Sequence, residues 1–459
     1  MIALDLRYFL ALVEKNGELL SIGEEVDPRF EVAEFLRQFD NVGGPVLLFE
    51  KVRGHSARIV GNLVGTRNRL AMAFGLKSEE ELLEVYRKRR LRKIQPRRVR
   101  SGPAKQVVVK DLRTLPIPTY HEGDGGPYIT CGIMTAKDPV SGLRSMGLHR
   151  LQIKGKRKMG VHLSNPPIAR FAANAERNGK PLGVGISLGV HPVILLASII
   201  TAPNEDKVAI ASSLLGRPVE LVGCDTVDAE APAHAEVVIE GKILPHIRER
   251  EGPFGETSGY YFSDDSHVIE VTAITCRKDP IIQALHPTAH EVSLLGGPAG
   301  EAEMIQMLRE RGFMVEDLVI SQSSNRTHVA LSLRKSHGTD PRQLLYFLLS
   351  GVPYIKHAVV VDDDVNVRDP KDIEWAIATR FQGNEDLVVI PNMRARAIDP
   401  SKKGGDSMTK VGLDATVPIR ARDRFKRIGV PREVREKVEK SIRQWTRENP
   451  HAQNPRTRK

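Results

Sequence analysis

ITCGIMTAKD (129–138) and SMGLHRLQIKG (145–155) open a run of strand patterns that decides the fold of this chain. In both stretches, apolar residues alternate with polar or small ones, which is typical of β-strands. Similar patterns recur, with turn residues between them, in LGVGISLGV (182–190), AEVVIEGKIL (235–244) and HVIEVTAITCRK (267–278). The sequence therefore predicts a central β domain.

The regions on either side of this β domain predict mixtures of helices and strands. Helical spacing is expected at 5–20, 27–39, 77–93, 301–312 and 340–351, and strands at 44–52, 57–65, 315–321, 357–364 and 386–391. A segment rich in Pro and Gly, PIPTYHEGDGGPY (116–128), marks a domain boundary. We predict an α+β or α/β multidomain protein with an α/β N-terminal lobe at 1–115, a catalytic domain at 116–300 and an α/β C-terminal domain at 301–459, which ends in a charged helix and a frayed tail.

Length and composition are those of an ordinary globular protein. The chain has 459 residues, of which 41% are hydrophobic and 27% charged. Its longest apolar run, VILLASIITA (193–202), is much shorter than the roughly 20 residues that cross a bilayer. The N-terminal sequence lacks the basic and then apolar order of a secretory signal, and three widely spaced cysteines fit reduced thiols. These features predict a cytoplasmic protein with no membrane partner.

The positive charge of the chain is concentrated in one short run. Nine Lys or Arg residues and no acid lie in RKRRLRKIQPRRVR (87–100), and removing them from the net charge of +11 leaves +2. Such a run is usually a solvated linker or helix end. The alternative is a nucleic-acid-binding or assembly surface that neutralises phosphates, although no aromatic platform accompanies the run.

REGPFGETSGYY (250–261) is the segment most indicative of chemistry. Glu251 and Glu256 enclose two glycines and a proline, so the backbone turns and both acids are expected on one side of a loop. Acids in such turns are often simply solvated. With Arg150 nearby, one acid would stay ionised while the other kept a proton to donate, which is an acid–base arrangement.

Five ordered motifs carry a resemblance to a known family. They are SMGLHRLQI (145–153), LVGCDTVDAEAPAHAEVVIEG (221–241), EGPFGETSGYY (251–261), HAVVVDDDVNVRDPKDIEWAIATR (357–380) and TKVGLDAT (409–416). Together they resemble the UbiD family of reversible decarboxylases, which use prenylated FMN. The resemblance implies a split β-barrel that binds the flavin, and a C-terminal domain that assembles homodimers or hexamers.

The resemblance also implies catalytic roles. The Glu–Arg–Glu network of the family falls on Arg150, Glu251 and Glu256. Glu256 would protonate the carbon that has lost its carboxylate, Arg150 would orient the substrate carboxylate and the flavin edge, and Glu251 would hold the other two in place. The implied substrate is an aromatic, heteroaromatic or α,β-unsaturated carboxylic acid, and a flavin prenyltransferase would supply the cofactor. An FMN-dependent oxidoreductase remains an alternative, although no dinucleotide fingerprint is present.

The implied cofactor site departs from its relatives at the flavin phosphate. By resemblance, the flavin would contact Ser145, Gly147, Leu148, Arg150, His162, Ser198, Lys207 and Lys410. The family joins the phosphate to manganese through Asn, His and Glu, with potassium nearby. Here the corresponding residues are Ser145, His162 and Lys207, with Glu205 two residues away. Either Lys207 and Lys410 replace part of the charge of the metal, or the register is shifted, Glu205 is the ligand and Lys207 lies on the surface.

Other candidates carry weaker signals. Thr257, His286 and His290 are expected near the substrate, although either histidine is more commonly structural. His149 alternates to the strand face opposite Arg150, which predicts a structural role. The acidic string 362–364 suggests a metal site, but its place between a strand and NVRDP favours a capped turn.

Overall fold

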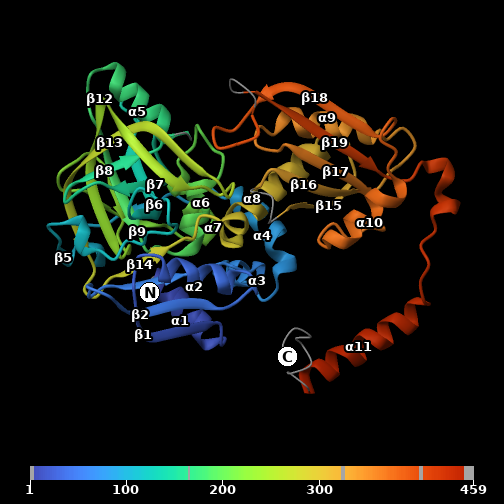
Figure 1. The fold of residues 1–459 in the computed structure, drawn as a ribbon, viewed down its shortest axis with the longest axis horizontal. Helices are drawn as coiled ribbons and strands as arrows, with labels where there is room; N and C mark the ends of the chain where they lie inside the picture. Colours follow the sequence, from blue (N-terminus) through green and yellow to red (C-terminus); the bar gives the residue numbers. More distant parts are fainter. Residues whose placement is uncertain (1–4, 164–165, 322–325, 403–406, 449–459) are drawn as a thin grey trace.

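We describe the fold from a computed structural model, which covers residues 5–163, 166–321, 326–402 and 407–448. Three regions follow one another along the chain, namely an N-terminal lobe, a barrel and a C-terminal domain (Figure 1). The mixed α/β multidomain class predicted from the sequence is confirmed. The predicted frayed tail at 449–459 lies outside the described residues.

The N-terminal lobe is a four-stranded sheet packed against helices. Its elements are α1 (Leu6–Lys15), β1 (Leu19–Val26), α2 (Glu31–Asp40), β2 (Val46–Val52), β3 (Arg58–Gly61), α3 (Arg67–Ala73) and α4 (Leu82–Arg90). The strand order is β1-β2-β3-β14, and β14 (Ile281–Ala284) arrives from beyond the barrel to pair parallel with β3. Ser78 caps a short 3-10 turn that precedes α4, so the helix expected at 77–93 is divided.

The central β domain closes into a six-stranded barrel. Its strands are β6 (Tyr128–Lys137), β7 (Arg144–Ile153), β8 (Lys158–Val161), β9 (Leu182–Leu188), β12 (Val237–Gly255) and β13 (Tyr261–Cys276). They lie in the order β12-β9-β6-β7-β8-β13, and antiparallel pairing of β13 with β12 completes the ring. Apolar residues from all six strands fill the same buried cluster, among them Leu151, Ile186 and Ile269. Burial of the apolar positions explains why the strand patterns were legible in the sequence.

Smaller elements join the barrel to its surroundings. Helices α5 (Ile168–Arg177), α6 (Pro192–Ile199) and α7 (Lys207–Leu215) pack on it, and β10 (Glu220–Gly223) pairs with β11 (Glu230–Pro232). The short strands β4 (Arg97–Arg98) and β5 (Val107–Val108) pair with β10 and β13, so the chain enters the central region before residue 116. The apolar run at 193–202 is largely the buried helix α6. Within the described ranges, no helix has the length and apolar character needed to cross a membrane.

The C-terminal domain is a five-stranded sheet with helices on it. Strands β15 (Val315–Ile320), β16 (His328–Leu333), β17 (His357–Asp362), β18 (Leu387–Arg394) and β19 (Ser407–Ala415) lie in the order β15-β16-β17-β19-β18. Helices α9 (Pro341–Gly351) and α10 (Pro370–Arg380) complete it. Asp362 and Asp364 both bind Arg380, so two members of the acidic string serve a structural ion pair.

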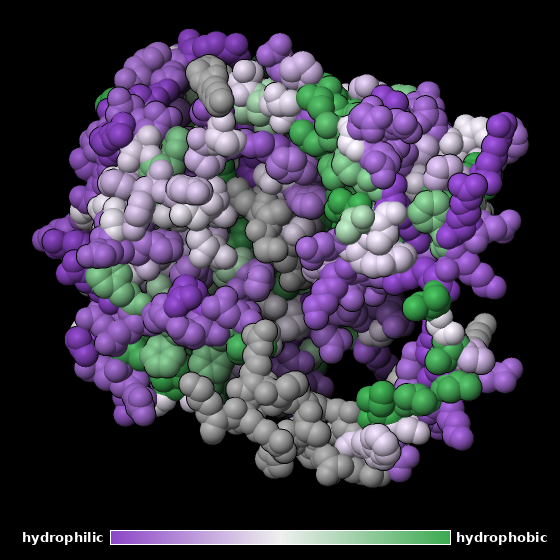
Figure 2. Space-filling view, turned by 45° about the vertical axis from the view of Figure 1, so that its right-hand side comes forward, coloured by the Kyte–Doolittle hydropathy of each residue, from purple (hydrophilic) through white to green (hydrophobic). Residues whose placement is uncertain are grey.

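Two helices of this part of the chain depart from the sequence pattern. Helix α8 (His290–Arg309) begins 11 residues before the expected start at 301 and crosses the predicted boundary at 300. Gly296, Gly297 and Pro298 interrupt the apolar pattern of this helix in the sequence. In the structure they are helical and buried. Helix α11 (Arg432–Glu448) lies apart from the body (Figure 1). Its exposed apolar residues lie on the arm that Figure 2 shows at the lower right.

Candidate active site

Arg150 is bound on both sides by the two acids of the predicted motif. Its Nε and Nη2 donate to the two carboxylate oxygens of Glu251 at 3.0 and 2.7 Å, and its Nη1 pairs with Glu256. The Glu251 side chain is fully buried, and those of Arg150 and Glu256 are about one-tenth exposed. The structure thus brings Arg150 together with two acids that follow it about 100 positions later in the sequence.

The β12–β13 hairpin creates this arrangement. Between Glu251 and Phe254 the register of the two strands shifts, and Gly252 takes a φ of +101°, which is accessible chiefly to glycine. The bulge places both acids against Arg150 on β7. The guanidinium also lies over the rings of Phe254 and Phe262, at 5.0 and 5.4 Å from their centroids. The two aromatic rings and the two carboxylates therefore hold the Arg150 guanidinium in one orientation.

A second group of residues holds the hairpin and was missed by sequence reasoning. Asp124 Oδ1 accepts from the Gly255 backbone N–H at 2.8 Å, while its Oδ2 accepts from those of Tyr120 and His121 at 3.2 and 2.9 Å. Gln152 accepts from the Gly252 N–H at 3.3 Å. Asp124 belongs to the segment at 116–128 that was interpreted only as a boundary. The available signal was an acid followed by two glycines, which is typical of a tight loop.

Tyr128 is a further missed residue of this region. Its ring packs on Phe254 with centroids 4.4 Å apart, and its buried hydroxyl lies beside the Glu251 carboxylate. Burial and the neighbouring Glu251 carboxylate raise the pKa of Tyr128, so this hydroxyl remains protonated. It is a neutral donor beside the ionic group.

The three predicted substrate residues lie in different surroundings. Thr257 follows Glu256 directly, and its hydroxyl is buried without a partner. His286 is buried with its ring 5.3 Å from that of His121, and burial lowers the pKa of His286 to about 3. The ring of His290 lies 3.2 Å from an Asp40 carboxylate oxygen in the N-terminal lobe. The His290 ring is thus paired with an acid of the N-terminal lobe.

The phosphate-end residues Ser145, Ser198 and Lys207 form a buried group. Ser145 Oγ donates to the Glu205 carbonyl at 2.9 Å and accepts from the Lys207 backbone N–H at 3.4 Å. Lys207 Nζ donates to the Ser198 carbonyl at 3.1 Å. The Lys207 residue is only 3% exposed, and burial lowers the pKa of its ammonium to about 8. Lys207 is therefore a buried cation with one carbonyl partner, and the surface alternative is wrong.

The carboxylate of Glu205, the alternative metal ligand, pairs with Arg90 at 2.6 Å. Only His162 of the expected ligand positions carries a suitable donor, and an ammonium such as Lys207 repels metal ions. Among the residues that the structure describes, no cluster of three or more His, Cys, Asp or Glu side chains could hold a metal. These residues do not fit a manganese centre.

The structure also corrects the prediction that Lys410 lies beside the flavin phosphate. Its ammonium donates to the carbonyls of Leu349 and Val352 at 2.6 and 2.8 Å, at the end of α9 in the C-terminal domain. It was expected beside the phosphate because TKVG is part of the family pattern. Burial in its own domain gives Lys410 the role of closing a helix end, where unpaired carbonyls need donors.

The remaining cofactor candidates lie along β7 and β8. Gly147 allows the ring of His149 to lie close, because a Cβ there would come within 2.7 Å of His149 Nε2. Leu148 packs against the apolar core from a half-buried position. Burial lowers the pKa of both His149 and His162, and the Nε2 atom of each is buried without a partner. Neutral rings with free nitrogen atoms remain available to a ligand.

The basic run is largely engaged within the fold. Arg89 donates to the carbonyls of Phe74 and Leu214, Arg90 binds Glu205, and Arg97 and Arg98 pair with Glu220 and Glu230. Lys88 also pairs with Glu84, so five of the nine cations are directed to partners in the chain. This use weakens the alternative of a phosphate-binding surface.

The site residues fit a flavin mononucleotide. One end has a buried ammonium beside hydroxyl and imidazole groups, which suits a phosphate, and the other has Arg150 between aromatic rings. His149 Nε2 and His162 Nε2 are buried and have no hydrogen-bond partner among the described residues, so both can bind a polar group of a ligand.

Comparisons with known proteins agree with this geometry. Three family models match in order along the chain, all described as domains of 3-octaprenyl-4-hydroxybenzoate carboxy-lyase. The N-terminal domain matches residues 10–88, the Rift-related domain 97–290 and the C-terminal domain 293–415.

Individual relatives are similar over nearly their whole length. Anhydromevalonate phosphate decarboxylase of Methanothermobacter thermautotrophicus is 31% identical over 91% of this chain and 98% of that protein. The evolved dimeric form of the UbiD-class enzyme HmfF from Pelotomaculum thermopropionicum, in complex with prFMN, has a TM-score of 0.85 at 38% identity, covering 94% and 97% of the two chains. Apo 3,4-dihydroxybenzoic acid decarboxylase (AroY) from Klebsiella pneumoniae has a TM-score of 0.86 at 29% identity, covering 93% and 97%. With three family domains and full-length relatives, this chain belongs to the UbiD family of decarboxylases, which are carboxy-lyases.

Proposed function

We propose that this enzyme decarboxylates an aromatic, heteroaromatic or α,β-unsaturated carboxylic acid with prenylated FMN, by the network of Arg150, Glu251 and Glu256. The observation that carries the proposal is the single guanidinium between two buried carboxylates. In the overall reaction the carboxylate leaves as carbon dioxide, and a proton takes its place on the same carbon. A dedicated proton donor is therefore the minimum that the chain must supply.

Glu256 is the proton donor in this proposal. It lies at the hairpin tip, is slightly exposed, and is followed by Thr257, whose N–H donates to it at 3.2 Å. Glu251 is fully buried and bound by two nitrogens of Arg150, so it holds the guanidinium in place. Arg150 then orients the substrate carboxylate beside the donor. When bound, the prenylated flavin supplies the electron sink that cleavage of the carbon–carbon bond requires.

Lys207 holds the flavin phosphate in this proposal, without a divalent ion. A buried ammonium gains a strong charge-assisted hydrogen bond when a phosphate approaches it. Ser145 and Ser198 lie beside Lys207 and provide polar contacts, whereas His162 lies nearer the Arg150 side, with its ring on Phe262. Potassium and manganese have no role in this proposal.

The substrate class rests on what the relatives act on. Their names specify a dihydroxybenzoic acid in one case and an anhydromevalonate phosphate in another. We infer a small-molecule acid within that range, a flavin prenyltransferase as the source of cofactor, and a homodimer or hexamer, by analogy with the dimeric relative.

The test is co-expression with a flavin prenyltransferase, followed by a screen for carbon dioxide release across aromatic, heteroaromatic and α,β-unsaturated acids. Release that requires both the prenylated cofactor and Arg150 would support the proposal. A chain that binds flavin but oxidises or reduces its substrates with an added electron donor would instead be an oxidoreductase.

A further inference from the structure

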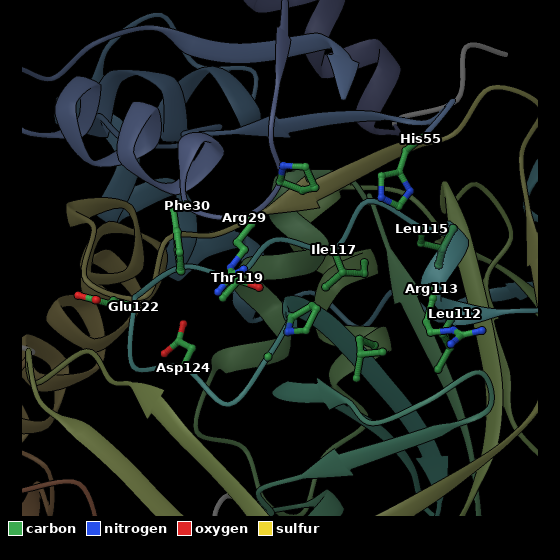
Figure 3. Close-up of a pocket in the computed structure, with 14 residues that line it drawn as sticks. Arg29, Phe30, His55, Leu112, Arg113, Leu115, Ile117, Thr119, Glu122 and Asp124 are labelled. Carbon is green, nitrogen blue, oxygen red and sulfur yellow. The ribbon is translucent and has the colours of Figure 1, made fainter. Parts of the chain in front are cut away.

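A cavity of about 420 Å³ lies outside the Arg150 site, between the N-terminal lobe and the barrel (Figure 3). Its apolar lining includes Leu112, Leu115, Ile117 and Ile153. Most ligand sites are concave, mainly apolar and of this size, with a few polar groups that orient the ligand. None of Arg150, Glu251 and Glu256 lines this cavity, so it is a separate place.

Arg29 lines this cavity, and its guanidinium has no ion-pair partner among the described residues. Its guanidinium stacks on the Phe30 ring at 5.1 Å, and it makes no ion pair within the described part of the chain. Arg113 lines the same cavity, but Asp111 binds its guanidinium through three hydrogen bonds. Of the two acids in the lining, Asp124 is bound by backbone N–H groups, and Glu122 lies with it on the side of Arg29, opposite Arg113 (Figure 3). Among the described residues neither acid forms an ion pair with Arg29. Arg29 is therefore the anchor available to an anion.

The backbone beside Arg29 is held in an unusual conformation. Phe30 has a φ of +76°, a region that bulky residues rarely adopt. Two hydrogen bonds clamp it to the loop before β6, from the Phe30 N–H to the Thr119 carbonyl at 3.0 Å and from the Thr119 N–H to the Pro28 carbonyl at 3.1 Å. Strained residues of this kind persist where surrounding structure fixes them, often at ligand sites.

The same loop continues from the cavity to the catalytic hairpin. Thr119, Glu122, Asp124, Gly126 and Pro127 line the cavity. Within this loop, Asp124 accepts from the Gly255 N–H at 2.8 Å, and the Gly125 N–H donates to the Pro253 carbonyl at 2.7 Å. A ligand that orders the loop therefore acts directly on the segment between Glu251 and Glu256.

We propose that this cavity is a second binding site, for a small apolar carboxylic acid. The carboxylate pairs with Arg29, the apolar body lies on Leu115, Ile117 and Ile153, and binding stiffens the loop at 119–127 and with it the catalytic hairpin. Because the site is separate, its occupancy does not require turnover, and it is tested without an activity assay.

The test measures binding of 2-naphthoate to the full chain by calorimetry, together with hydrogen exchange of its backbone. We expect protection of 119–127 and 251–256 in the wild type, and a loss of affinity of about tenfold or more in Arg29→Ala, as for one charge-assisted pair. Arg29→Lys should recover most of the affinity. Arg113→Ala, the matched control in the same cavity, should change it less than twofold, since Asp111 already neutralises that guanidinium.

Three results would overturn the proposal: no measurable binding, equal affinity in the wild type and Arg29→Ala, or protection confined to residues around Lys207. The last two would place 2-naphthoate in the flavin and substrate site. A chain that failed to decarboxylate any acid yet bound 2-naphthoate through Arg29 would refute the proposed function and leave this site intact.

Discussion

Arg150 is the central residue of the site, because its guanidinium binds two carboxylates at once. Removing either acid leaves a partly uncompensated buried cation, so the most informative substitution keeps the shape and hydrogen bonding of the side chain. Glu256→Gln removes the transferable proton and the charge of the carboxylate but keeps the shape of the side chain. We expect flavin binding to persist and turnover to fall by a factor of about 10² to 10⁴, the usual contribution of a general acid.

The measurement is carbon dioxide release alongside the flavin absorbance spectrum. Glu249→Gln is the control, since Glu249 lies on β12, the strand that leads to Glu256, but pairs with Lys154 and Lys158. Wild-type rates in Glu256→Gln would remove Glu256 from the role of proton donor.

Asp124 acts through the hairpin that it holds. Asp124→Asn turns a donor toward the N–H groups of Tyr120 and His121, so the loop should shift. We expect kcat to fall by about 10- to 100-fold, as small misplacements of catalytic groups do, with a smaller change in KM. Asp264→Asn is the control, because Asp264 is exposed opposite Glu251 in the register. Equal kinetics in the two variants would contradict a positioning role.

Lys207 distinguishes a phosphate site built on an ammonium from one built on a metal. Lys207→Met should weaken FMN binding by about 10- to 100-fold and leave riboflavin binding unchanged, because riboflavin lacks the phosphate. Lys207→Arg keeps the charge and serves as the matched control. Equal losses for FMN and riboflavin, or one manganese per wild-type chain in the reconstituted protein, would refute the lysine proposal.

Helix α8 joins the three regions, and its first turn carries a buried acid. Glu291 is 2% exposed and accepts from the Val64 N–H of the N-terminal lobe at 2.9 Å. Burial raises the pKa of Glu291 from 4.5 to about 7. The folded state therefore keeps a proton that the unfolded state has already lost between about pH 4.5 and 7, so stability falls as the pH rises through that window.

Glu291→Gln should remove this dependence. We expect the free energy of unfolding of the wild type to fall relative to the variant by up to about 3 kcal/mol between pH 4.5 and 8, measured by urea unfolding. The difference between the two proteins cancels the contributions of other groups that titrate in this window. Glu310→Gln, an exposed acid just beyond the same helix, should show no such difference. A constant difference in the free energy of unfolding between the wild type and Glu291→Gln across this pH range would contradict the raised pKa.

The molecule as a whole places helix α11 away from the body, with an apolar face exposed. Val434 and Val438 are about half exposed, four residues apart on one face. In a homodimer this face is a natural contact, so Val434→Asp together with Val438→Asp should shift the protein toward monomer in sedimentation velocity. Val140→Asp changes an exposed valine on a turn and should leave the mass unchanged. An unaltered dimer in the double variant would place the interface elsewhere.

Sequence patterns were most informative where structure is local. The barrel strands were recognised as short apolar stretches between turn residues, and β6 is buried at almost every position. Helix α9 was recognised because its apolar residues recur along one face. The start of α8 was missed because buried glycines and a proline imitate a turn. For the site, the motif order located Arg150 and both acids, whereas Asp124 and Tyr128 lay in segments with no catalytic pattern.

Local periodicity and ordered motifs in the sequence thus determined the β domain, the family and the three residues of the proposed catalytic network. Tertiary structure alone decided the closure of β13 on β12, the insertion of β14 beside β3, the burial of Lys207 with Glu205 turned outward, and the loop that ties a second cavity to the hairpin. The physical reason is that hydrogen bonds and ion pairs between residues far apart in the chain depend on how the regions pack, and packing leaves no periodic signal in the sequence.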